Sequence, residues 1–417
     1  MSQLIYDIIV VGAGPVGSTA AYTTTKLGLK TLLIEEHMAV GSPPHCAGKL
    51  SVLAFKEFNL PTKCILNSVK GAYLYPPSNT PLTVCKEETE AHIIDRELLD
   101  RKLAERAEDA GAELRLGLKI RELQKNPEGL FLMGRKLGGE ASQVKARLVI
   151  DASGVDSFLV RQLGLRGKLS HLSGIQYEMS GVSFEGEKYV ELYFSREMFP
   201  GFFAWIIPLG GDVARVGLCV REGLATSSPR RYLEKALGNH PVLCKKARGG
   251  KVVRVYGGRI SIHGPLKETY RDAFLAVGDA VGHAKSTTGG GVYFGMKAAR
   301  IGGKVAAECL EKGDTGARSL ARYQKLCAEK FGQELSFTST ARRVLDGTSD
   351  LELNRIFKVM LGDQRLLRSI EKSGDTAYQS RIRLPLLISA GRSAFKKPKD
   401  LQLFARIFLR GLIDMVK

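Results

Sequence analysis

The residues best suited to chemistry near the start of the chain are three glycines and an acid. Gly12, Gly14 and Gly17 follow the spacing G-x-G-x-x-G, and Pro15 comes directly after the second glycine. Gly12 permits a sharp turn, Gly14 lets the backbone approach a pyrophosphate, and Gly17 lets a helix pack near the preceding strand. A helix that starts here presents free N–H groups to phosphates. Glu35 can accept hydrogen bonds from a ribose 2′-hydroxyl, so the pattern predicts a dinucleotide without a 2′-phosphate.

These residues need a strand, a turn, a helix and a second strand to hold them, and residues 7–35 read in that order. Ile8–Val11 is an apolar, β-branched run that is typical of a strand buried on both faces. Thr31–Ile34 is a second such run and leads directly into Glu35. A glycine-rich turn without a ligand is the alternative interpretation. Because the strand, the helix and the acid all stand at the right distances, the full pattern favours a nucleotide site.

Two later segments place glycine and aspartate directly after apolar strands. The predicted strand 145–150 leads into Asp151-Ala152-Ser153-Gly154, and the predicted strand 273–277 leads into Gly278-Asp279-Ala280. The stretch between them is rich in strands, and its β-branched and aromatic content from about residue 174 fits a mostly antiparallel sheet. The sequence therefore predicts an α/β fold in which an antiparallel-sheet domain interrupts a Rossmann-like dinucleotide domain.

The predicted domain boundaries follow from that interruption. A chain of 417 residues exceeds one ordinary domain, so two linked domains are the natural expectation. We expect the dinucleotide domain to span 1–70, 92–170 and 265–310, the inserted substrate domain to span 71–91 and 171–264, and a helical C-terminal region to span 311–417.

The composition narrows the remaining classes. Lys and Arg outnumber Asp and Glu by 62 to 43, a formal net charge of +19, which fits nucleic acid, an anionic lipid surface or an anionic substrate. Seven cysteines are scattered without a C-x-x-C pair, so we expect no metal site, no disulfide scaffold and a reducing cytoplasm. No apolar run approaches the roughly 20 residues of a membrane span. Because the chain enters a strand almost at once, we also expect no signal peptide.

The basic character is strongest in residues 381–417. This tail contains nine Lys and Arg residues against two Asp, and Phe, Leu and Ile residues are interleaved with them. A helix of this kind can lie in the interface of an anionic membrane, which predicts a cytoplasmic protein that associates peripherally with membranes. An ordinary solvated face is the alternative interpretation.

Taken together, the three motifs resemble those of the FAD flavoproteins of the para-hydroxybenzoate hydroxylase type. Within that group the chain is similar to the geranylgeranyl reductase family, in particular the digeranylgeranylglycerophospholipid reductases, over about residues 4–310. Pro44–Gly48 resembles the family's P-x-x-C-A segment, and Phe199–Pro208 resembles its P-x-x-Y-x-W-x-F-P substrate motif. Thr287–Val292 resembles its T-T-G-G-G-I segment beside the flavin.

The resemblance implies FAD, an isoprenoid lipid substrate and saturation of the C=C bonds of geranylgeranyl chains in archaeal-type membrane lipid biosynthesis. The cofactor-binding residues that it implies are Gly12, Gly14, Pro15, Gly17, Glu35, Ala47, Gly48, Arg96, Ile120, Asp279, Gly291 and Val292. The substrate-binding residues that it implies are Phe203, Trp205 and Pro208.

Several side chains around these motifs have more than one interpretation. Cys46 is implied near the reacting carbons, where its thiol could donate a proton, shape the cavity or order a water; a small buried hydrophobic role is the alternative. Phe203 and Ile207 stand where the family has tyrosine and phenylalanine, so the chain lacks that phenol hydroxyl. We expect His283 and Lys285 to be solvated or to face phosphate rather than to act in catalysis.

Other functions remain open at this stage. A flavin monooxygenase or halogenase of an aromatic substrate shares the flavin motifs, and a menaquinone or prenyl diphosphate side chain could replace the lipid. An electron-transfer flavoprotein dehydrogenase would need an iron–sulfur cluster near the C-terminus, yet no cysteine follows Cys327. A nucleic-acid partner would explain only the charge, so we expect none. Because FAD takes the single fingerprint, the electron donor is either NAD(P)H or a docked ferredoxin or reductase.

Overall fold

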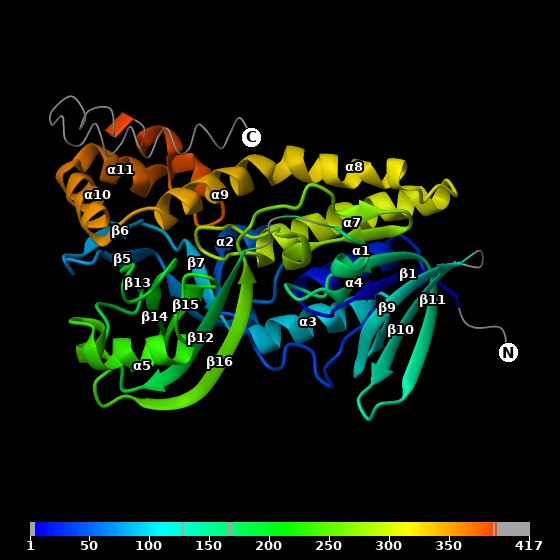
Figure 1. The fold of residues 1–417 in the computed structure, drawn as a ribbon, viewed down its shortest axis with the longest axis horizontal. Helices are drawn as coiled ribbons and strands as arrows, with labels where there is room; N and C mark the ends of the chain where they lie inside the picture. Colours follow the sequence, from blue (N-terminus) through cyan, green and yellow to red (C-terminus); the bar gives the residue numbers. More distant parts are fainter. Residues whose placement is uncertain (1–4, 127–128, 166, 168–169, 387, 390–417) are drawn as a thin grey trace. The chain divides into compact units, whose positions relative to one another are not determined.

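The computed structural model describes residues 5–126, 129–165, 167, 170–386 and 388–389. The chain forms two compact units, and each is assembled from three separate stretches (Figure 1). The first unit lies within Met1–Pro44, Arg96–Leu169 and Ser261–Leu335, and the second lies within His45–Asp95, Ser170–Ile260 and Ser336–Lys417.

The first unit is built on an eight-stranded sheet with helices packed on it. Its strands are β1 (Ile5–Val11), β2 (Thr31–Ile34), β8 (Glu113–Arg115), β9 (Leu118–Asn126), β10 (Gly129–Lys136), β11 (Ala141–Asp151), β17 (Tyr270–Arg271) and β18 (Phe274–Ala276). Its helices are α1 (Pro15–Lys26), α3 (Arg96–Asp109), α4 (Phe158–Gln162), the turn η2 (Gly278–Val281), α7 (Val292–Glu311), α8 (Ala317–Cys327) and the π-helical η3 (Ala328–Gly332).

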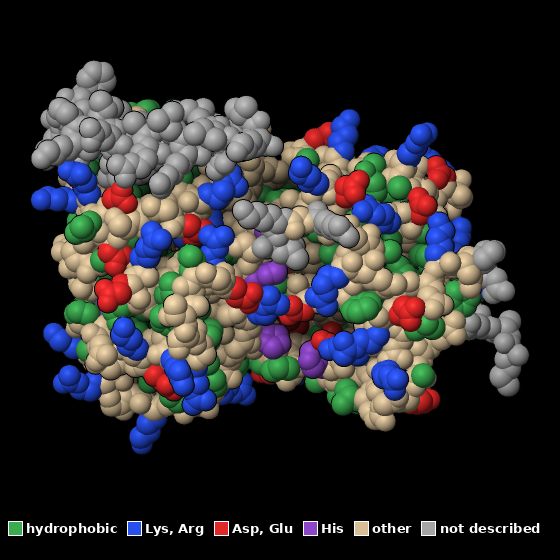
Figure 2. All heavy atoms as spheres, viewed as in Figure 1, with side chains coloured by type: hydrophobic (Ala, Val, Ile, Leu, Met, Phe, Trp, Pro, Cys, Tyr) green, Lys and Arg blue, Asp and Glu red, His purple; other side chains and the backbone are tan. Residues whose placement is uncertain are grey.

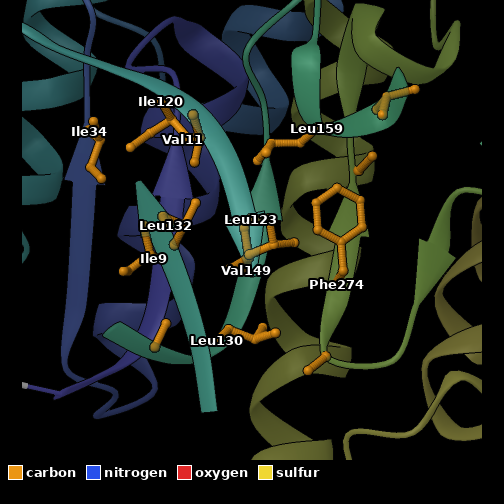
Figure 3. Packing of buried hydrophobic residues seen from close by; sticks show 14 of the residues in the cluster. Ile9, Val11, Ile34, Ile120, Leu123, Leu130, Leu132, Val149, Leu159 and Phe274 are labelled. Atoms are coloured by element: carbon orange, nitrogen blue, oxygen red, sulfur yellow. The ribbon is translucent and has the colours of Figure 1, made fainter. Parts of the chain in front are cut away.

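The centre of this sheet is parallel, as the sequence predicts. The order β18-β11-β1-β2-β8 runs parallel throughout, and β1 lies between β11 and β2. Ile8, Ile9 and Val10 are fully buried, since helices cover both faces of a doubly wound sheet. Figure 3 shows Ile9 and Val149, from β1 and β11, in the same apolar cluster as Phe274 of β18.

The sequence does not predict the antiparallel extension of the first sheet. The sequence predicts a single strand at 113–118 in this region, whereas in the structure β9 and β10 form a hairpin and β10 also pairs with β11. The register shifts between Met133 and Gly134, and a Cβ on Gly134 would lie 2.4 Å from the carbonyl oxygen of Lys119. The buried positions in β9 are Leu118, Ile120 and Leu123, so the alternation breaks at this register shift and the periodicity is weak.

The second unit contains two sheets and most of the C-terminal helices. Its strands are β3 (Lys49–Ser51), β4 (Ile65–Val69), β5 (Gly71–Tyr75), β6 (Leu82–Cys85), β7 (Ala91–Ile94), β12 (His171–Ser180), β13 (Tyr189–Tyr193), β14 (Ala204–Gly210), β15 (Val213–Arg221) and β16 (Lys251–Ser261). Its helices are α2 (Val52–Phe58), η1 (Thr62–Cys64), α5 (Pro229–Asn239), α6 (Leu243–Lys246), most of α9 (Gln333–Asp346), α10 (Asp350–Gly362), α11 (Gln364–Ser373) and η4 (Gln379–Ile382).

The larger sheet has the order β16-β12-β15-β14-β13-β5-β6; from β12 to β13 and between β5 and β6 the pairs are antiparallel, whereas β13 and β5 are parallel. Alternation gives it two different faces. One face packs Ile206, Val216 and Leu218 into an apolar core together with Leu233 of α5. The opposite face we call the Trp205 face, and it consists of Phe203, Trp205, Ile207, Arg215, Gly217 and Cys219 with Gln176 and Glu178 of β12.

The predicted α/β class with an inserted antiparallel sheet is confirmed, but the units divide the chain at other positions than the predicted domains. Residues 45–70 group with the second unit, where β4 and β3 both pair with β7. Helix α8 groups with the first unit, where the Tyr323 hydroxyl donates to the carbonyl of Ala276 at 2.9 Å. The sequence also predicts two strands at 252–255 and 259–262, and the structure joins them in the single strand β16.

The C-terminal region is helical up to the end of the described residues, but the structure describes only the first part of the basic tail. Residues 390–417 of that tail lie outside the described residues. On the face in Figure 2, Lys and Arg side chains are spread among Asp and Glu rather than gathered into one patch. No helix in the described part of the chain combines the length and apolar character that crossing a bilayer requires.

Candidate functional site

The glycine turn after β1 is sterically tight at two of its three glycines. Gly12 has a φ of +97°, and a Cβ there would lie 2.6 Å from the carbonyl oxygen of Ala152. A Cβ on Gly17 would lie only 1.7 Å from the carbonyl oxygen of Gly12. Gly14 differs, because its φ is −66° and no atom lies within 4 Å of an added Cβ. Neither packing nor a positive φ requires glycine at this position, and the open space leaves room for a ligand to approach the backbone.

Glu35 closes this turn from the end of β2. Its carboxylate accepts a hydrogen bond from the Ala13 backbone N–H at 2.9 Å and others from the backbone N–H and Nδ1 of His37 at 3.0 and 2.6 Å. The acid therefore stands beside the glycine turn, where the sequence places it. Pro15 is the first residue of α1, which begins at the same turn.

The Asp151 motif supports the turn rather than facing solvent. The fully buried Asp151 carboxylate accepts hydrogen bonds from the backbone N–H and hydroxyl of Ser153, at 3.0 and 2.6 Å, and from the Ser157 hydroxyl. Burial raises the pKa of Asp151, and the serine hydrogen bonds partly oppose this. Ser157 also caps α4. The motif thus shapes the loop that lies against Gly12.

The third motif brings Asp279, Gly291 and Arg96 together. A Cβ on Gly291 would lie 2.4 Å from Oδ1 of Asp279, and Val292 follows as the first residue of α7. Burial raises the pKa of Asp279 to about 6, and the positive charge of Arg96 opposes this shift. Arg96 also binds Asp100 through two hydrogen bonds of 3.0 and 2.9 Å.

Val16 joins the first motif to the third. A Cβ on Gly278 would lie 3.2 Å from the Val16 side chain, and one on Gly295 would lie 2.6 Å from it. The start of α1 therefore lies directly against the Gly278–Asp279 turn and α7. The structure brings nine of the predicted cofactor residues to this part of the first unit: Gly12, Gly14, Pro15, Gly17, Glu35, Arg96, Asp279, Gly291 and Val292.

These residues fit a flavin dinucleotide. Within the described part of the chain, no group donates a hydrogen bond to the Asp279 carboxylate, and its burial raises its pKa. A polyol such as a ribityl chain supplies the donors that this carboxylate lacks. The open space at Gly14 and the N-terminus of α1 fit a pyrophosphate.

Ile120 and His283 differ from the sequence expectation in opposite ways. Ile120 is 8% exposed and packs in the apolar cluster of the first unit with Val11, so its side chain is a core residue (Figure 3). His283 and Lys285 are buried, at 2% and 5% exposure, so the expectation that they are solvated is wrong. Burial lowers the pKa of His283 to about 4, and its neutral ring accepts a hydrogen bond from the Gly278 N–H at 3.2 Å.

The Cys46 segment belongs to the second unit and is held by a buried arginine. The NH1 group of Arg215 donates to the carbonyl oxygens of Ala47 and Ile94, both at 3.0 Å. Gly48 has a φ of +80°, and a Cβ there would lie 2.2 Å from the same NH1 group. The Gly48 N–H in turn donates to Sγ of Cys46 at 3.3 Å. The half-buried Cys46 thiol is therefore fixed by its own loop and by β15.

The Trp205 face contains the other predicted substrate residues. The Trp205 ring lies against Gly217, where a Cβ would come 2.7 Å from it, and its Nε1–H donates to Oε1 of Gln176 at 2.9 Å. The Phe203 ring meets the Trp205 ring edge-on, with centroids 6.3 Å apart. Strand alternation places Pro208 on the opposite face, so the structure does not bring its ring to this surface.

Sequence reasoning missed the polar groups on this face. Nε of Arg215 and Nε2 of Gln176 are buried and have no hydrogen-bond partner in the described structure. The nearest carboxylate to that Nε is Glu178, at 3.6 Å. The only signal in the sequence is an arginine at an inward position of the apolar strand VARVGLCVR. Arg215 and Gln176 therefore give an otherwise apolar surface two hydrogen-bond donors.

A metal is not indicated by this geometry. The residues that the structure describes contain no group of three or more His, Cys, Asp or Glu placed to hold an ion.

Family models and relatives agree on the class of protein. Residues 7–199 match the model of the FAD dependent oxidoreductases, and residues 171–260 match that of the geranylgeranyl reductase catalytic domain. A digeranylgeranylglycerophospholipid reductase of Methanocaldococcus jannaschii is 33% identical over 362 residues, covering 85% of this chain and 90% of the relative. A digeranylgeranylglycerophospholipid reductase 2 of Methanopyrus kandleri is 32% identical over 367 residues, covering 85% and 90%.

Solved structures give the same fold. A geranylgeranyl bacteriochlorophyll reductase-like protein of Thermoplasma acidophilum is 26% identical and superposes with a TM-score of 0.82, covering 97% of this chain and all of that one. The halogenase PltM is 18% identical with a TM-score of 0.70, covering 98% and 96%, and this likeness shows the fold alone.

Proposed function

The chain belongs to the digeranylgeranylglycerophospholipid reductase family, and from that membership we propose that it saturates C=C bonds in the geranylgeranyl chains of an archaeal-type glycerophospholipid. The observation that supports this most strongly is the Trp205 face. It lies within the part of the chain that matches the geranylgeranyl reductase catalytic domain, and it combines the side chains of Phe203, Trp205 and Ile207 with the polar groups of Arg215, Gln176 and Glu178. Such a surface suits a hydrocarbon chain.

FAD, when bound, would supply the hydride for this reduction. Glu35 would hold its ribose, the turn at Gly14 and the N-terminus of α1 its pyrophosphate, and Asp279 its ribityl chain. Phe203 and Trp205 would orient the alkene and exclude water from it. The remaining requirement is a proton for the second carbon of the reduced bond.

Cys46 is our candidate for the proton donor, because the chain has phenylalanine at position 203 and no phenol there. Arg215 acts as a positioning residue, since its hydrogen bonds to the Ala47 and Ile94 carbonyls fix the loop that contains Cys46. Cys219 lies on the Trp205 face as well, but burial raises the pKa of its thiol to about 12 and a packing role is sufficient for it.

The partners follow from the proposed substrate. A membrane lipid is reached from an anionic membrane surface, which we propose as the site of peripheral docking from the cytoplasm. The donor of reducing equivalents is either NAD(P)H or a reduced ferredoxin, since the described first unit contains one dinucleotide turn and FAD would take it.

The test is a lipid analysis that does not depend on the physiological donor. Purified protein is loaded with FAD, reduced with dithionite and incubated with digeranylgeranylglycerophospholipid, with geranylgeranyl diphosphate and with a menaquinone. Mass spectrometry then counts the added hydrogen. We expect the phospholipid to be reduced fastest. Preferred reduction of the diphosphate or the menaquinone would transfer the proposal to that substrate, and reduction of none of the three by the flavin-loaded protein would contradict a prenyl reductase.

A further inference from the structure

The end of strand β15 contains two arginines that share one aspartate. Arg221, the last residue of β15, contacts Oδ2 of Asp346, and NH2 of Arg342 lies 2.7 Å from Oδ1 of the same carboxylate. Arg342 and Asp346 are one helical turn apart on α9. In the described part of the chain, Asp346 is the only carboxylate within ion-pair distance of either guanidinium. The cluster therefore carries one uncompensated positive charge.

Arg342 is buried to a degree that this pairing does not explain. Only 6% of the residue is exposed, and its Nε has no hydrogen-bond partner in the described structure. Burial lowers the pKa of Arg342, and the neighbouring Arg221 lowers it further, whereas Asp346 opposes both. A buried cation with an unused N–H donor is unfavourable unless an anion supplies the missing partner.

The cluster stands at one end of the aromatic row of the Trp205 face. The Arg342 guanidinium lies 5.8 Å from the centroid of the Phe202 ring. Phe202 is stacked on Phe203 at 4.0 Å, and Phe203 meets Trp205 edge-on. The row of aromatic rings thus has a surplus positive charge at one end. A lipid with an apolar chain and an anionic headgroup has the complementary arrangement.

We propose that Arg342, assisted by Arg221, binds the phosphate of the lipid substrate while the isoprenoid chain follows the aromatic row to Trp205. The inference rests on the proposed function for the identity of the lipid, but the binding itself can be measured without turnover. Guanidinium groups suit this role because their N–H donors match two phosphate oxygens at once. The competing explanation for this cluster is a purely structural set of ion pairs that joins α9 to β15 and binds no ligand.

Trp205 provides the readout, because it is the single tryptophan of the chain. The FAD-loaded protein is titrated with digeranylgeranylglyceryl phosphate and with uncharged digeranylgeranylglycerol, both in the same neutral detergent micelles. The change in Trp205 fluorescence gives a Kd for each lipid. Dithionite-driven reduction of the same two lipids is measured in parallel. Thermal unfolding and FAD content confirm that each variant is folded.

Arg342→Met should lower the preference for the phosphorylated lipid, expressed as the ratio of the two Kd values, by at least about tenfold. Arg342→Lys keeps the positive charge but loses the paired N–H donors of the guanidinium, so it should lower this preference by a smaller factor. The matched control is Arg343→Met, an exposed arginine on the same helix with the same change in net charge, and it should keep the wild-type ratio. A fall of equal size for both lipids in Arg342→Met would overturn the proposal in favour of a purely structural tie.

Further outcomes distinguish a lipid phosphate from free phosphate, and the headgroup site from the proposed reductase function. Inorganic phosphate alone should not stabilise the wild type at millimolar concentration; stabilisation that Arg342→Met abolishes, with an unchanged lipid ratio, would indicate a site for free phosphate and overturn the lipid assignment. If the wild type discriminates between the lipids and reduces neither, the proposed function fails and the headgroup site stands. If it reduces both without discrimination, the headgroup site fails alone.

Discussion

The candidate site of the first unit is formed mainly by backbone atoms, whereas that of the second unit is formed by side chains. In the first unit the candidate site depends mainly on the path of the backbone. Glycine is needed at Gly12 and Gly17 because carbonyl oxygens lie close to where a Cβ would be. In the second unit side chains on neighbouring strands meet, with Arg215 and Trp205 on adjacent strands and Gln176 on a third. A site formed by the backbone constrains residues that are consecutive in the sequence. A site formed by side chains on one face of a sheet constrains residues that are far apart in the sequence. The following changes test whether this distinction is real.

Gly17→Ala should have the largest effect, because its Cβ would lie 1.7 Å from a backbone oxygen that cannot move without opening the turn. We expect a loss of more than about 4 kcal/mol in the free energy of unfolding and little FAD in the purified protein. Urea unfolding and the flavin absorbance measure the two effects. Gly238→Ala is the control, since an added Cβ there has no atom within 4 Å, and wild-type flavin content in Gly17→Ala would contradict the argument.

Arg215→Met tests the side-chain site in the same way. It removes the donors to two buried carbonyl oxygens, so we expect a loss of about 3 kcal/mol in the free energy of unfolding. Reductase activity should fall together with stability because the Cys46 loop loses its anchor. Arg230→Met removes an exposed arginine of the same unit, whose ion pair with Glu234 water screens, and should leave the free energy of unfolding unchanged within error. Equal, small effects of both changes would mean that Arg215 fixes nothing.

Cys46→Ala tests the proposed proton donor of the second unit. We expect kcat to fall about 100-fold, the usual contribution of a general acid, with the Kd for lipid largely retained. The matched change Cys219→Ala removes a thiol whose pKa burial raises to about 12 and should leave kcat within about threefold of the wild type. Similar kcat values for the two variants would assign Cys46 to packing.

Asp279→Asn should stabilise the empty protein. Burial raises the pKa of Asp279 to about 6, so between about pH 4 and 6 the folded apoprotein binds more protons than the unfolded chain and loses stability as the pH rises. Asparagine removes this penalty, and we expect a gain of about 2 kcal/mol at pH 7 together with weaker FAD binding.

Urea unfolding of the two apoproteins from pH 4 to pH 7 measures the Asp279 effect. The His283 pKa, lowered to about 4, adds the opposite slope to both proteins, so it cancels in their difference. A difference that does not change with pH would show that the Asp279 carboxyl titrates normally.

Gly14→Ala should have the smallest effect on folding and still impair the cofactor. Since no atom lies within 4 Å of its Cβ, the free energy of unfolding of the apoprotein should change by less than about 0.5 kcal/mol. The Kd for FAD should rise at least about tenfold, because the methyl group would occupy the space of the pyrophosphate. Flavin fluorescence titration measures this, and an unchanged Kd would place the cofactor elsewhere.

Local sequence rules predicted the parts of the fold that depend on local sterics. The strand, turn, helix and strand of residues 5–34 follow from apolar runs and glycine spacing, and the structure has them at those positions. The sequence predicts two strands, at 252–255 and 259–262, where the structure has the single strand β16, and Gly257 and Gly258 lie between them. In the structure these glycines continue the strand because His45 lies against them, with Nδ1 donating to the Gly257 carbonyl at 2.9 Å. A contact over that sequence distance has no local signal.

The same reasoning explains which site residues escaped prediction. Arg215, Gln176 and Arg342 belong to no motif, and each gains its meaning only from the strand or helix beside it. Cys46, by contrast, was found through a short motif of neighbouring residues, and Trp205 through another. The sequence therefore predicts where the candidate site of the second unit lies but not which polar side chains stand beside it.

The Asp279 carboxyl has a consequence for the life of the protein. A partly dehydrated acid without hydrogen-bond donors is tolerable only while a ligand satisfies it, so a chain that has not acquired its flavin is the weaker of the two forms. Proteases that sample transient opening would therefore remove flavin-free copies first, and a shortage of flavin would reduce the amount of protein rather than leave an inactive pool.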